Sequence, residues 1–147
     1  MKAWIIVAVL CLFGVGPAFA AQKPETFAEL KLRADATPPE ECVRVCAGVA
    51  RRAIEEAKDQ FAAGADGAAK ALIADVKTYA DKAADAATRS RKHEKQLEID
   101  LRDLSHHLDA LKHQVGVEDQ QSVEEAMAHL EKLRTRLLDS MFGKGKK

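Results

Sequence analysis

Two cysteines four residues apart are the first feature of this sequence that could carry chemistry. Cys42 and Cys46 are the only cysteines outside a predicted signal peptide. On a helix, residues four apart share a face, with Cβ atoms roughly 5–6 Å apart, whereas a relaxed disulfide needs roughly 3.5–4.5 Å. The spacing leaves four states open: a strained bridge within the helix, a bridge between chains, free thiols, or a metal or redox role.

Three histidines form a second candidate site. His106 and His113 lie about two helical turns apart, and an antiparallel helix pairing would bring His129 near His106. Imidazoles that converge in this way are ligands for transition metals such as zinc, copper or nickel. No fixed ligand spacing such as H-E-x-x-H is present, and polar residues beside an apolar seam are ordinary. Periplasmic metal binding or metal sensing is therefore the alternative function.

Basic residues form a third candidate site, a surface for anionic envelope phospholipid or polymer. They are Arg89, Arg91, Lys92 and Lys95 in the middle of the chain, and Lys144, Lys146 and Lys147 in a flexible tail at 143–147. Clustered basic residues more often mark a helix face that is simply exposed to solvent. Because 23 basic residues balance 23 acidic ones, we expect no nucleic-acid partner.

Catalytic motifs are missing from the sequence. There is no glycine-rich phosphate loop, no nucleophile elbow and no C-x-x-C-H haem site. Trp4 lies in the predicted signal peptide, so few aromatic side chains are left to line a deep pocket. We therefore predict that the protein is not an enzyme, and that it has no catalytic residues and no cofactor other than the metal considered above.

The N-terminal residues 1–20 have the pattern of a cleaved secretory signal. Lys2 precedes an apolar stretch, and Ala18-Phe19-Ala20 is a small-x-small cleavage site before Ala21. The apolar stretch is too short for a comfortable membrane span, and no later one is long enough. We expect export to the periplasm or the extracellular space. A leader at 21–37, with a possible short helix, follows the signal.

A single helical domain is predicted over 38–142, with helices at about 38–63, 66–115 and 119–142. The middle helix has no Pro or Gly from Ala68 to Val115 and is rich in strong helix formers. Its apolar seam is alanine-rich at first and leucine-rich later, and residues 88–96 between the two halves contain no apolar side chain. We predict one continuous helix with a solvated middle. A bend at 88–96 that folds the chain into a compact bundle is the alternative.

Short turns near Gly64 and Gly116 predict that the flanking helices lie antiparallel on the two halves of the long helix. The expected fold is an all-α, elongated, antiparallel rod, with a coiled-coil-like arrangement of three helices. Such a rod buries little surface per residue, so we expect self-association or a protein partner. The predicted function is that of an exported, non-catalytic structural, adaptor or chaperone-like component of the periplasm or cell envelope.

Overall fold

The computed structural model describes residues 23–143, and over this range the chain forms five α-helices and no strand. The helices are α1 (Phe27–Ala36), α2 (Pro39–Ala62), α3 (Asp66–Ser90), α4 (Glu94–Lys112) and α5 (Val117–Phe142). The predicted all-α class is confirmed. The predicted signal peptide at 1–20 and the tail lysines Lys144, Lys146 and Lys147 lie outside the described residues.

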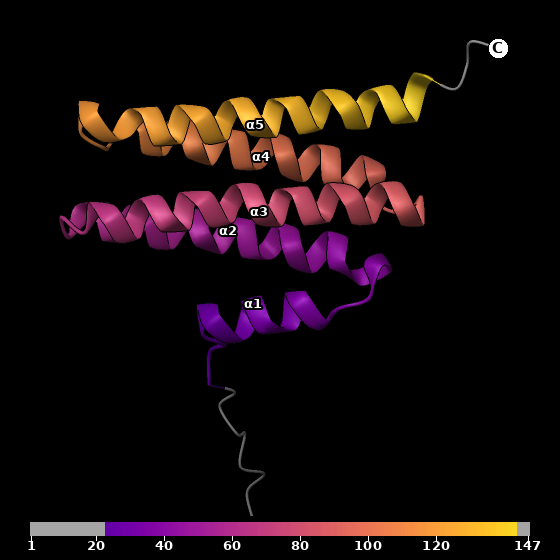
Figure 1. Ribbon diagram of the computed structural model, residues 1–147, viewed down its shortest axis with the longest axis horizontal. Coiled ribbons are helices and arrows are strands. Elements are labelled where there is room, and N and C mark those ends of the chain that lie inside the picture. The colour runs from indigo at the N-terminus through magenta and orange to yellow at the C-terminus, as the bar shows by residue number, and fades with distance from the viewer. Residues whose placement is uncertain (1–22, 144–147) are drawn as a thin grey trace, which may run out of the picture.

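Two antiparallel helical hairpins stack on each other (Figure 1). In one hairpin α2 pairs with α3, and in the other α4 pairs with α5. Between the hairpins, α5 lies against α3 and α4 lies against α2, and the helices of each of these two pairs run parallel. Helix α1 lies on the side of the α2–α3 hairpin that faces away from α4 and α5. The antiparallel neighbours expected from the short turns are confirmed.

The continuous helix predicted for 66–115 is wrong, and so is the elongated rod. The helix ends at Ser90 and a new one begins at Glu94. Between them, Arg91 and His93 adopt the left-handed conformation, with φ of 56° and 63°. The alternative bend at 88–96 is the arrangement found, and it reverses the chain so that α4 returns along the first hairpin.

Burial of the leucine seam explains this bend. Each left-handed residue other than glycine costs about 1–2 kcal/mol, whereas a fully buried leucine contributes about 1.5–3 kcal/mol. Folding back places five leucines of α4, each at most 2% exposed, in one core with the first hairpin. They are Leu97, Leu101, Leu104, Leu108 and Leu111. The burial of these side chains outweighs the strain of two backbone positions.

The two hairpins are built from residues of different size. Between α2 and α3 the buried side chains are mostly small, among them Ala50, Ala53, Ala57, Ala80 and Ala83, so the two backbones can approach closely. In α4 and α5 the buried side chains are mostly leucines. The predicted change from an alanine-rich to a leucine-rich seam therefore falls between the two hairpins.

Helix α1 is the short helix expected in the leader. It begins with a capping box in which Thr26 and Glu29 bond each other's backbone N–H groups. Polar contacts then fix it to α3: Lys31 Nζ lies 2.9 Å from Asp75 Oδ2, and Asp35 accepts hydrogen bonds from Tyr79 and Lys82. These contacts hold α1 over the first turns of α2, where the two cysteines lie.

Candidate functional site: the groove between α2 and α4

The cysteine pair lies in the first two turns of α2, in the core. Cys42 is 9% exposed and Cys46 is fully buried, and both are free thiols with their Sγ atoms 2.6 Å apart. Burial, and next the hydrogen bond with Cys42, raise the pKa of the Cys46 thiol far above its ordinary value. Since the thiolate is the nucleophile, Cys46 is unsuited to attack a substrate.

We expect the two cysteines to be bridged when the protein is made in an oxidising compartment. Their sulfurs already face each other, so two thiols need only lose two hydrogens to a disulfide-bearing oxidoreductase. Protein purified without reductant should have an intact mass lower by two hydrogens, and Cys42→Ser should abolish this difference. Full alkylation of both cysteines in the unfolded, unreduced protein would contradict the prediction.

The structure does not gather the three candidate histidines into one group of ligands. His129 Nε2 lies 2.9 Å from Asp81 Oδ1 on α3 and so joins the two hairpins. His106 is exposed on α4, and His113 is exposed directly after the end of that helix. Over residues 23–143, no group of three or more His, Cys, Asp or Glu side chains has an arrangement that could hold a metal ion. The contact with Asp81 directs the ring of His129 to α3.

The middle basic residues all lie at the end of the bundle where α3 gives way to α4. Arg89, Arg91, Lys92 and Lys95 are exposed there, as a solvated face requires. Lys92 Nζ pairs with Glu40 Oε2 at 2.8 Å, which ties the bend to the start of α2. The remaining three form no ion pair within the part of the chain that the structure describes.

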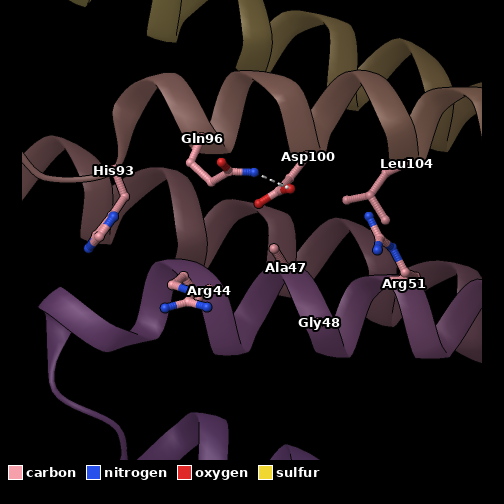
Figure 2. A pocket seen from close by; sticks show the side chains of 8 residues that line it. All are labelled: Arg44, Ala47, Gly48, Arg51, His93, Gln96, Asp100 and Leu104. Carbon is pink, nitrogen blue, oxygen red and sulfur yellow. Dashed lines mark hydrogen bonds between the residues drawn. The ribbon is translucent and has the colours of Figure 1, made fainter.

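A groove of about 530 Å³ lies between α2 and α4 and opens beside this basic end (Figure 2). Its lining comes from three segments: Arg44, Ala47, Gly48 and Arg51 of α2, His93 of the bend, and Gln96, Asp100 and Leu104 of α4. In Figure 2 the residues of α4 face those of α2 across the opening. The groove therefore combines a polar rim with a small apolar floor.

Small residues on α2 create this groove. Ala47 and Gly48 face α4, and a Cβ atom added at Gly48 would meet no atom within 4 Å. A longer side chain there would fill the space between the helices. The groove is therefore a consequence of residue size at two adjacent positions of α2.

Charges on the rim are only partly neutralised. Arg51 forms an ion pair with Asp103, and Gln96 Nε2 donates a hydrogen bond to Asp100 Oδ1 at 3.1 Å. Arg44 is exposed, and within the described part of the chain it forms no ion pair. Arg44 is thus an available guanidinium with five donor N–H groups on a rim that also contains the carboxylate of Asp100.

Gly48→Ala should stabilise the protein by about 0.5–1 kcal/mol, the usual difference between alanine and glycine inside a helix. The added methyl group enters open space, so no clash offsets the gain. Urea unfolding followed by circular dichroism measures the effect. A loss of stability would mean that α2 and α4 approach each other more closely at this position.

Sequence reasoning did not identify this groove. Its residues come from segments about fifty positions apart, and they meet only because the chain reverses at 91–93. The one local signal is a glycine inside an otherwise helical pattern, Gly48, which often has a packing or functional reason.

Comparisons with known protein families, with curated proteins and with solved structures found no match for this chain. Among the helices of residues 23–143, none combines the length and apolar character needed to cross a membrane.

Proposed function

We propose that this is an exported, non-catalytic helical protein that acts as an adaptor by binding a short acidic segment of a partner protein in the groove between α2 and α4. The observation that carries the proposal is the exposed Arg44 on the rim of an open groove that is floored by Ala47 and Gly48. An extended segment has the width to enter such a groove, and its carboxylates pair with a guanidinium.

The charged groups around the groove are basic apart from Asp103, which pairs with Arg51, and Asp100, which accepts a hydrogen bond from Gln96, so they favour an acidic occupant. Arg91 and Lys95 are exposed beside His93 and Gln96, which line its end. The same end contains the N-terminus of α4, whose backbone N–H groups add partial positive charge. Together these groups raise the local concentration of acidic segments and speed their association, an effect that salt weakens.

Peptide binding tests this function. A fluorescein-labelled (Gly-Glu)4 peptide should bind the protein in about 0.1 M salt, and the (Gly-Gln)4 peptide should bind at least tenfold more weakly. Arg44→Glu should lower the affinity at least tenfold, which corresponds to about 1.4 kcal/mol. Gly48→Leu should also abolish binding, because it fills the groove without changing the charge.

Arg136→Glu is the matched control, since Arg136 is an exposed arginine on α5 and does not line this groove. It should leave the affinity within about twofold of wild type, because long-range charge is screened beyond roughly 10 Å in 0.1 M salt. Equal losses in Arg44→Glu and Arg136→Glu would refute the groove as the binding site.

Export is the other half of the proposal, and the pattern of residues 1–20 supports it. Expression of the full chain in a bacterial host tests it by cell fractionation and intact mass. We expect the protein in the periplasm or the medium, with Ala21 as its first residue. Protein that keeps Met1 in the cytoplasm would contradict this part.

A further inference from the structure

The bend between α3 and α4 is short, and its backbone conformation is locally unfavourable. It consists of Arg91, Lys92 and His93, two of which are left-handed without being glycine. One carboxylate oxygen of Glu94, the first residue of α4, is buried, and no hydrogen-bond partner for it is found among the described residues. Local interactions therefore disfavour the bend, and packing between the hairpins holds it.

A straight helix is available to the same residues. No Pro or Gly lies between Ala68 and Val115, so residues 91–93 can adopt helical dihedrals. Helices α3 and α4 would then form one helix over residues 66–112, roughly 70 Å long at 1.5 Å per residue. Straightening removes the strain, but it separates each α4–α5 hairpin from its own α2–α3 hairpin.

We propose that two copies of this chain form a domain-swapped dimer, in which each α4–α5 hairpin packs on the α2–α3 hairpin of the other copy. Short hinges under strain favour such exchange, because every contact between the hairpins re-forms between the copies. In the monomer α4 runs antiparallel to α3. The two straightened helices therefore run antiparallel about a two-fold axis.

The contacts that re-form include apolar and charged groups. Both hairpins contribute to one apolar core, which cannot remain in water when they separate. Lys70 of α3 lies 2.7 Å from Asp119 of α5, whose side chain is 14% exposed. Arg51 of α2 pairs with Asp103 of α4. Each pair joins one hairpin to the other, so each becomes intermolecular in the dimer.

Charge reversal on separate chains tests whether these two pairs become intermolecular. The first variant has both basic residues reversed, Arg51→Glu and Lys70→Glu, and the second has both acidic residues reversed, Asp103→Arg and Asp119→Lys. Within either variant, like charges face each other in the monomer and in a swapped homodimer. Only a swapped heterodimer pairs opposite charges at all four positions.

The two variants are unfolded, mixed in equal amounts, refolded at high concentration, and analysed by native mass spectrometry. We expect the mixed dimer to exceed the sum of the two homodimers at least tenfold. A single chain with all four changes is the matched control, because it restores both pairs within one copy. It should fold and dimerise like wild type.

Two results would overturn the proposal. Dimers without preference for mixed pairs would show that the copies associate through another surface. A mixture that contains only monomers would show that the hairpins do not exchange. So would variants that stay unfolded after mixing while the four-change control folds.

The hinge supplies an independent readout. Arg91→Gly with His93→Gly relieves the left-handed strain of the monomer and weakens the straight helix. The dimerisation constant measured by light scattering should fall at least tenfold relative to wild type. An unchanged constant would show that the bend does not drive the exchange.

Discussion

Leu101→Ala should lower the free energy of unfolding by about 2–5 kcal/mol, the range for leucine truncation in a packed core. Leu101 is fully buried on α4 and belongs to the core that α4 shares with the first hairpin. The truncation removes apolar contacts and leaves a cavity between helices that relax only partly. Urea unfolding followed by circular dichroism gives the difference from wild type.

Ile99→Ala is the matched control because Ile99 lies on the same helix and is 44% exposed. Its side chain has the same number of carbon atoms, and the substitution raises the helix propensity at that position. We expect a change of less than about 1 kcal/mol, since surface substitutions are usually small in effect. Equal losses for Leu101→Ala and Ile99→Ala would contradict a buried leucine seam on α4.

Glu98→Gln should lower the free energy of unfolding at neutral pH by about 2 kcal/mol, within the range for hydrogen bonds to charged groups. Glu98 is the one charged residue buried within residues 23–143, at 8% exposure. Its carboxylate accepts a 2.7 Å bond from Arg134 Nε of α5 and two bonds, of 2.7 and 3.0 Å, from Arg102. The substitution leaves two guanidinium groups without their shared carboxylate.

The same carboxylate makes the stability depend on pH. Hydrogen bonds from Arg134 and then from Arg102 hold the pKa of Glu98 below its ordinary value of 4.5. A lowered pKa stabilises the folded state above the unfolded value, and this stabilisation disappears as the pH falls from about 4.5 through the folded pKa. Wild type should therefore lose more stability between neutral pH and acid than Glu98→Gln does.

Asp109→Asn is the control for this carboxylate, since Asp109 is an exposed acid on α4 whose Oδ1 atom lies 3.9 Å from His113 Nε2. It should change neither the free energy of unfolding at neutral pH nor the loss of stability on acidification appreciably, because such exposed pairs contribute little. Parallel pH profiles for wild type and Glu98→Gln would mean that Glu98 has the same pKa in the folded and unfolded states.

The sequence by itself determined the all-helical class, the small and leucine-rich seams, and the antiparallel pairing at the two short turns. Each of these depends on residues close together in the chain: the spacing of Ala80 and Ala83, or of Leu101 and Leu104, places their side chains on one helix face. Gly64 ends α2 with a φ of 75°, a conformation that glycine adopts without strain. Local propensity and periodicity were sufficient for these features.

Only the tertiary structure decided that α3 and α4 are separate helices, because nothing local at residues 91–93 breaks a helix. The bend is stabilised by the burial of leucines against residues about fifty positions away. Helix propensity, which is a local property, does not include the free energy of that burial. The groove has the same origin, since Arg44 and Asp100 line one groove only after the chain has reversed. The orientation of His129 also depends on the tertiary structure, because the packing of α5 against α3 directs its ring to Asp81.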